Sequence, residues 1–262
     1  MKILEDRING AATEALANAM YRYTFGIVGS GKDGAEGRSL GTGVGVFWKG
    51  TYLILTAAHT METTPYERLY FLLPNEGVQF QDSDIPAQPS PVNIRKRLSL
   101  ENPQTLLAEG GEDIATFLLP EQKEEQGQRH FYHLDDSHTS LPAFRQVGVL
   151  GYPGATRITV GSNFMATPYT SFGELAPLPI GFNPHSHIAI NYPSSQTIDP
   201  HGLSGCGLWI TEKGSEEKLW APKIGLYGLV TQWDAQSQVL IGYKVEELIS
   251  FLKTKDQWMT KA

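Results

Sequence analysis

The chain has 262 residues, 40% of them hydrophobic and 10% aromatic, which is enough to bury the core of one large or two small β domains. It carries 28 acidic and 21 basic residues, a net charge of −7, and this balance argues against a nucleic-acid partner, which usually requires a basic face. Cys206 is the only cysteine, so an intramolecular disulfide is excluded.

The first residues lack the apolar core of a secretory signal. No stretch of roughly 18 apolar residues is present either, so we expect no membrane span and no membrane partner. Together with the single cysteine, these features predict a soluble protein of a reducing compartment, the cytoplasm. Residues 3–20 are rich in alanine and place apolar side chains at helical spacing, which predicts an N-terminal helix over residues 1–20.

Short β segments follow this helix. Residues 21–28 predict a first strand, and Gly29–Gly37 predicts a turn, because it lacks the Gly-Lys-Ser/Thr ending of a phosphate loop. Residues 41–48 and 51–56 flank Lys49-Gly50 and predict a hairpin. Further strands are predicted at 69–73, 92–98, 114–119, 146–150, 157–160, 188–192, 207–211, 224–231 and 239–243, and an amphipathic helix at 245–253. This pattern is typical of an all-β barrel or sandwich.

Three residues, His59, Asp113 and Ser204, occur in contexts that suit a serine hydrolase. His59 ends the run LILTAAH, Asp113 opens the run DIATFLL, and Ser204 lies in the turn GLSGCG. A hydroxyl attacks an amide near neutral pH when an imidazole base and an orienting carboxylate assist it. Each motif alone is weak, but their joint occurrence in β context predicts a catalytic triad.

On these three motifs, the chain resembles the chymotrypsin/trypsin-like serine peptidases over roughly residues 22–248. The order His, Asp, Ser is that family's order and differs from the subtilisin and α/β-hydrolase orders. The resemblance implies two six-stranded antiparallel β-barrels with the site in the cleft between them. The first barrel, residues 21–125, would supply His59 and Asp113, and the second, residues 141–244, would supply Ser204. Residues 126–140 become the inter-barrel linker, and residues 245–262 form the C-terminal helix and tail.

The resemblance also implies a role for each residue. Ser204 Oγ attacks the scissile carbonyl, His59 takes its proton, and Asp113 holds the imidazole in the correct tautomer. The backbone N–H groups of Gly202 and Ser204 form the oxyanion hole. We expect no cofactor and no metal. His185 and His187 could form a metal pair, but no third ligand is evident, so a polar loop is the preferred interpretation.

Two residues beside the nucleophile depart from the family pattern. Leu203 stands where zymogen-type members carry an Asp that pairs with a newly made N-terminus. The chain therefore resembles bacterial-type members without zymogen activation. Cys206 replaces a second glycine after the serine, and it is interpreted either as a small buried thiol or as a redox-sensitive one.

Substrate specificity is the least determined feature. The family's S1 pocket corresponds here to Ile198, Asp199, His201, Thr231, Trp233 and Ile241. The apolar Ile198, six residues before Ser204, favours an uncharged P1 side chain. A one-residue shift of the loop would place Asp199 in the pocket and reverse that preference, and Trp233 could equally be ordinary core.

The leading hypothesis is a trypsin-like serine endopeptidase that cleaves a specific intracellular protein through an acyl-enzyme. Its expected partners are a protein or peptide substrate and an activating or substrate partner protein. A catalytically silent scaffold acting as an interaction or sensor module is the alternative, motivated by Leu203 and Cys206. An esterase or acyl transferase on the same scaffold is a third hypothesis. A bacterial stress or anti-phage defence system is the biological setting that the resemblance suggests.

Overall fold

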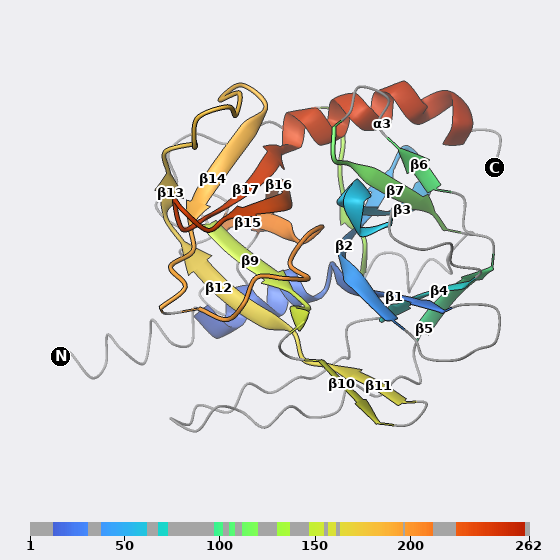
Figure 1. Ribbon diagram of the computed structural model, residues 1–262. Helices are drawn as coiled ribbons and strands as arrows, with labels where there is room; N and C mark the ends of the chain where they lie inside the picture. The colour runs from blue at the N-terminus through green and yellow to red at the C-terminus, as the bar shows by residue number, and fades with distance from the viewer. Residues whose placement is uncertain are drawn as a thin grey trace.

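A computed structural model describes residues 13–30, 38–61, 68–72, 97–101, 105–107, 112–119, 130–136, 147–154, 157–160, 163–195, 197–211 and 224–259 of the chain. The described residues form a mostly β protein in which two sheets lie beside each other (Figure 1). One helix, residues 13–21, precedes the sheets, and α3 (Val245–Met259) follows them. The predicted all-β class with a helix at each end is confirmed.

The first sheet has eight strands and comes from the first half of the chain. Seven of them are hydrogen-bonded in the order β5-β4-β1-β2-β3-β7-β6, and β8 pairs in parallel with β2. The strands are β1 (Thr24–Ser30), β2 (Arg38–Trp48), β3 (Thr51–Thr56), β4 (Arg68–Leu72), β5 (Arg97–Glu101), β6 (Thr105–Leu107), β7 (Ala115–Leu118) and β8 (Tyr132–His133). The short 3-10 helix η1 (Ala58–Thr60) follows β3 directly.

The second sheet has seven strands and comes from the second half of the chain. Its order is β12-β9-β15-β16-β17-β14-β13, with every pairing antiparallel. The strands are β9 (Val147–Gly151), β12 (Tyr169–Gly173), β13 (Leu175–Ala176), β14 (His187–Asn191), β15 (Gly207–Thr211), β16 (Ile224–Asp234) and β17 (Val239–Lys244). Between β9 and β12, β10 (Arg157–Val160) and β11 (Asn163–Ala166) form a separate hairpin.

The hairpin predicted around Lys49-Gly50 joins β2 to β3. Lys49 has φ 44° and Gly50 has φ 91°, so both turn residues are left-handed. Such turns match the right-handed twist of the flanking strands, and glycine takes this conformation without steric cost. The prediction of this hairpin is confirmed.

The first strand begins later than predicted. The helix continues through Tyr21, and the chain turns before β1 starts at Thr24. Met20 and Tyr21 are buried, and the Thr24 hydroxyl and the Tyr23 amide both donate to the Met20 carbonyl. These two bonds close the helix end, so the strand pairing of β1 starts at Thr24, although the Tyr23 carbonyl already accepts from the Gly45 amide of β2. Residues 1–12 of the predicted helix lie outside the described residues.

Several other segments also differ from expectation. Residues 92–96 of the strand predicted at 92–98 lie outside the described residues, and β5 covers Arg97–Glu101. β6, β11, β12 and β13 were not predicted. β8 lies inside the predicted linker 126–140, where Phe131 and Leu134 are buried. Part of that linker therefore packs on the first sheet.

A shared apolar core joins the two sheets. It contains Trp48 and Leu53 from the first sheet, Trp209 and Leu229 from the second, and Leu248 from α3. α3 continues directly from β17 and runs across to the first sheet (Figure 1). No helix in the described residues is long and apolar enough to cross a membrane.

Candidate active site

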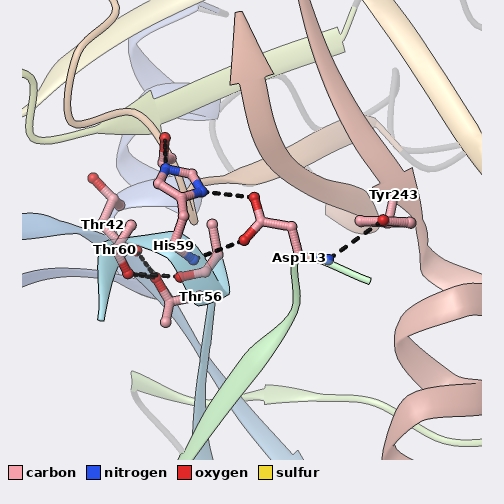
Figure 2. A network of polar contacts seen from close by, with 8 residues as sticks. Thr42, Thr56, His59, Thr60, Asp113 and Tyr243 are labelled. Carbon is pink, nitrogen blue, oxygen red and sulfur yellow. Dashed lines mark hydrogen bonds and ion pairs between the residues drawn. The ribbon is translucent and has the colours of Figure 1, made fainter. Parts of the chain in front are cut away.

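His59 lies within hydrogen-bonding distance of both Asp113 and Ser204. His59 Nδ1 is 2.6 Å from Asp113 Oδ2, and His59 Nε2 is 3.1 Å from Ser204 Oγ. The His59 backbone N–H also donates to Asp113 Oδ1 at 2.8 Å. Figure 2 shows the imidazole facing the carboxylate of Asp113. The three side chains predicted from sequence are thus brought together.

Strand pairing explains why Asp113 meets His59. β3 and β7 are antiparallel neighbours, and Thr56 at the end of β3 pairs with Ala115 at the start of β7. The residues just after Thr56 and just before Ala115 therefore leave the sheet at the same end of these two strands. η1 then turns the chain so that both the backbone and the ring of His59 face the same carboxylate.

Ser204 lies in a tight loop between residues 200 and 206. The Leu203 amide donates to the Pro200 carbonyl and the Cys206 amide to the Leu203 carbonyl, both at 2.9 Å. Gly202 and Gly205 have φ values of 96° and 86°, and residues with a Cβ rarely adopt such values. A Cβ at position 205 would also overlap the Thr42 carbonyl oxygen. Both glycines are therefore required by the backbone.

Two amides of this loop remain available to a ligand. Among the described residues, neither the Gly202 nor the Ser204 N–H donates to a protein acceptor, whereas the amides of Leu203, Gly205 and Cys206 do. Free backbone donors beside a nucleophile are the elements of an oxyanion hole. The two predicted donors thus have N–H groups that remain available to a ligand.

Tyr243 contacts Asp113, a role that the sequence did not indicate. The Asp113 backbone N–H donates to Tyr243 Oη at 3.4 Å (Figure 2). Burial raises the pKa of Tyr243, the hydrogen bond from Asp113 N–H opposes this, and the nearby carboxylates reinforce it. Tyr243 comes from β17, so this contact joins the second sheet to the carboxylate supplied by the first. Tyrosine in a buried strand gives no signal in the sequence, which is why it was missed.

The predicted S1 residues are only partly brought together. The Ile198 carbonyl accepts a bond from Tyr192 Oη at 2.8 Å. Trp233 packs against the apolar cluster that contains Tyr192 and Leu203. Thr231 is buried. Ile241, in contrast, lies in a different cluster with Ala189 and Val239, because it is on the other face of β17 from Leu240.

Asp199 is paired with His201 beside the nucleophile loop. Asp199 Oδ1 accepts from the His201 backbone N–H at 3.0 Å and lies 2.5 Å from His201 Nδ1. The side chains of Asp199 and His201 are 60% and 82% exposed. The backbone bond from His201 and then its side-chain bond lower the pKa of Asp199. The Asp199 carboxylate is therefore exposed, and it is bonded to His201.

The two unusual residues beside Ser204 are both buried. Leu203 and Cys206 are fully inaccessible and belong to the same apolar cluster. Burial raises the pKa of the Cys206 thiol far above its usual range. A protonated, inaccessible thiol is unreactive, so the interpretation of Cys206 as a structural residue is favoured.

The described residues contain no group of three or more His, Cys, Asp or Glu side chains that could hold a metal ion. His187 instead packs on Tyr243, with ring centroids 4.5 Å apart. His187 Nδ1 also lies 2.8 Å from Ser186 Oγ.

Two solved structures illustrate what the fold is similar to. A mutant of human heparin binding protein matches with a TM-score of 0.58 and 10% identity, covering 89% of this chain and 90% of its own. Neuropsin, a serine protease expressed in the limbic system of mouse brain, matches with a TM-score of 0.56 and 12% identity, covering 89% of this chain and 93% of its own. The fold is chymotrypsin-like. No protein-family model and no curated protein sequence matches the chain. At these identities the likeness establishes the fold alone.

Proposed function

We propose that this chymotrypsin-like protein is a serine endopeptidase in which Ser204, His59 and Asp113 form the catalytic triad. The observation that carries the proposal is the continuous contact from Asp113 Oδ2 through both ring nitrogens of His59 to Ser204 Oγ, at 2.6 and 3.1 Å. The protease-like fold supports a protein or peptide as the substrate.

The geometry suits proton transfer in one direction. An ionised Asp113 can only accept, so His59 Nδ1 carries the proton of that bond and Nε2 is left as an acceptor. Ser204 Oγ–H then donates to Nε2, and the ring takes this proton as Oγ attacks the scissile carbonyl. The imidazolium that forms is stabilised by Asp113, and it returns the proton to the leaving amine.

The developing negative charge requires donors that are already in place. The free N–H groups of Gly202 and Ser204 supply them in this proposal. Water then attacks the acyl-enzyme with His59 again acting as the base. No metal or cofactor takes part in this scheme.

We also propose that the protein is active without removal of a propeptide, as bacterial-type members of the family are. Leu203 cannot form the ion pair that zymogen-type members make before the nucleophile. Its burial in the apolar cluster and the hydrogen bonds of its amide instead stabilise the loop. We further propose that the protein cleaves a specific partner protein in the bacterial cytoplasm, in a stress or defence pathway, with a partner protein controlling activity. The single buried cysteine suits a reducing compartment.

An uncharged P1 side chain is part of the same proposal. Asp199 is exposed and bonded to His201, which leaves the less polar Ile198 and Trp233 as the neighbours of the pocket. Cleavage-site profiling on a denatured proteome reports this preference directly, and cleavage after Arg or Lys would contradict it.

A fluorophosphonate probe tests the triad. We expect covalent labelling of Ser204, found by mass spectrometry, and loss of both labelling and peptide cleavage in Ser204→Ala. Ser194→Ala, an exposed serine of the neighbouring loop, is the matched control and should keep full labelling. A folded wild-type protein that takes no label, with or without its partner, would refute the proposal.

The second candidate function is a silent scaffold that binds a partner. It is favoured by Leu203 and Cys206 beside the nucleophile and by the fold match to a heparin binding protein, which is named for binding. If this alternative holds, Ser204→Ala retains the full biological effect of the protein.

A further inference from the structure

Thr42 lies where three segments of the chain meet behind the nucleophile loop. It is fully buried in β2, and its side chain and backbone contact both halves of the protein. Thr42 Oγ1 donates to the Gly202 carbonyl at 2.8 Å and accepts from the Tyr152 amide at 2.9 Å. The Thr42 amide donates to the Ser204 carbonyl at 3.0 Å.

The direction of the hydroxyl proton is fixed by its neighbours. The Tyr152 N–H can only donate, so it must bond to a lone pair of Thr42 Oγ1. The one proton of the hydroxyl is then directed to the Gly202 carbonyl, which can only accept. The Thr42 hydroxyl thus bonds both neighbours in only one arrangement, and in that arrangement its proton is donated to the Gly202 carbonyl.

Every carbonyl of the nucleophile loop from residue 200 to residue 204 accepts a hydrogen bond. In chain order the donors are the Leu203 amide at 2.9 Å, the Gly154 amide at 2.6 Å, Thr42 Oγ1 at 2.8 Å, the Cys206 amide at 2.9 Å and the Thr42 amide at 3.0 Å. Thr42 supplies two of these five bonds and the only one from a side chain. Each carbonyl shares its planar peptide group with the N–H of the next residue. The bond from Thr42 Oγ1 therefore fixes the peptide that joins Gly202 to Leu203. This peptide lies between the two peptides that carry the proposed oxyanion donors, the N–H groups of Gly202 and Ser204.

Thr42 also connects this loop to the base. Its carbonyl accepts from Thr56 Oγ1 at 2.7 Å, and Thr56 Oγ1 lies 3.4 Å from Thr60 Oγ1, next to His59 (Figure 2). Glycines allow this close approach. A Cβ at Gly151 would come within 2.9 Å of Thr42 Oγ1.

We propose that Thr42 is a positioning residue whose side-chain hydroxyl orients the backbone of the nucleophile loop and so sets the oxyanion hole. The inference rests on the proposed serine-hydrolase function and adds to it a residue that touches neither substrate nor the reacting atoms. Thr42 acts through the Gly202 carbonyl and leaves the proton chemistry of His59 unchanged.

The test compares Thr42→Val, which keeps the shape and loses the hydroxyl, with Thr42→Ser, which keeps the hydroxyl. The matched control is Thr24→Val, which removes another fully buried threonine hydroxyl, bonded to the Met20 carbonyl at the start of β1. The acylation rate constant is measured from the burst of 4-nitrophenol released from 4-nitrophenyl acetate, as a function of pH. Circular dichroism sets a temperature at which every variant is folded.

We expect Thr42→Val to lower the acylation rate constant by on the order of 10–100-fold, since loss of a whole oxyanion donor typically costs on the order of 10²–10³. The pH midpoint of acylation should stay in place, and Thr42→Ser and Thr24→Val should acylate within about threefold of wild type.

Three outcomes would overturn the inference. The first is a folded Thr42→Val protein that acylates as fast as wild type, with the proposed function left intact. The second is an equal loss in Thr24→Val, which would make the effect one of general packing. The third is a folded wild-type protein that releases no 4-nitrophenol and takes no fluorophosphonate label, which would refute the proposed function itself and this inference with it.

Discussion

Asp113 is held to His59 by two hydrogen bonds, one to the ring and one to the backbone amide, at 2.6 and 2.8 Å. Two bonds from one carboxylate to one residue fix the orientation of both side chains. The carboxylate is still partly accessible, since the side chain of Asp113 is 31% exposed. Its orientation therefore depends on what holds the Asp113 backbone, and Tyr243 is the contact that does so from the second sheet.

Tyr243→Phe should lower kcat/KM for ester or peptide substrates by about two- to tenfold, because a typical hydrogen bond contributes about 0.5–1.5 kcal/mol. The bond is long, at 3.4 Å, so the lower part of this range is expected. Steady-state kinetics measure the effect. Tyr52→Phe is the control, because the Tyr52 ring packs on Phe47 and Phe131 far from Asp113. An equal loss in the two variants would contradict a specific role for Tyr243.

At the scale of elements, α3 follows the second sheet and is hydrogen-bonded to the first. Asp256 near the end of α3 accepts from Trp48 Nε1 at 2.8 Å and from Lys49 Nζ at 2.7 Å, and both donors lie at the β2–β3 turn. Burial raises the pKa of Asp256, but the bonds from Lys49 and Trp48 and the charges of Lys49 and Lys253 outweigh this, so the net pKa is lowered. The charged form of Asp256 is thus favoured by folding.

This lowered pKa gives a pH-dependent prediction. A carboxyl whose pKa is lower in the folded state stabilises the protein above its unfolded pKa of about 3.9, and this stabilisation is lost as the pH falls through the folded value. Asp256→Asn should therefore lower the melting temperature near neutral pH, and the difference from wild type should shrink at about pH 3. Thermal melts at both pH values measure it. Asp136→Asn, at a more exposed ion pair with Lys253, should change the melting temperature less. A difference that grows on acidification would contradict the assignment.

Local sequence signals predicted much of the fold and the three residues that the structure brings together at the candidate site, and they failed where long-range contacts decide. The β2–β3 hairpin and β15 were predictable, because short apolar runs and a turn dipeptide are local features. β8 was not predictable from the sequence. Its residue Tyr132 pairs with β2, but it lies in a polar, charged stretch of sequence that contains few apolar residues. Thr42 was missed for the same reason. Its bond to Gly202 spans 160 positions, and a threonine between two glycines gives no periodic signal.

At the scale of the whole molecule, the site exists only when both halves are docked. His59 and Asp113 leave the first sheet and Ser204 leaves the second, so the contact between His59 and Ser204 spans 145 positions. The apolar core shared by the two sheets and the helices is what keeps them together. Because that core is continuous, the two halves should unfold in one cooperative transition together with the site.

Leu248→Ala tests this cooperativity. Leu248 is fully buried in the shared core, so its truncation should lower the free energy of unfolding by about 2–5 kcal/mol. In guanidinium titrations, tryptophan fluorescence and fluorophosphonate labelling of Ser204 should shift together to lower denaturant. Leu175→Ala, at a side chain that is 41% exposed, should shift neither midpoint appreciably. If labelling disappeared well before the fluorescence change, the halves would separate before they unfold, and the shared core would not be what holds Ser204 against His59.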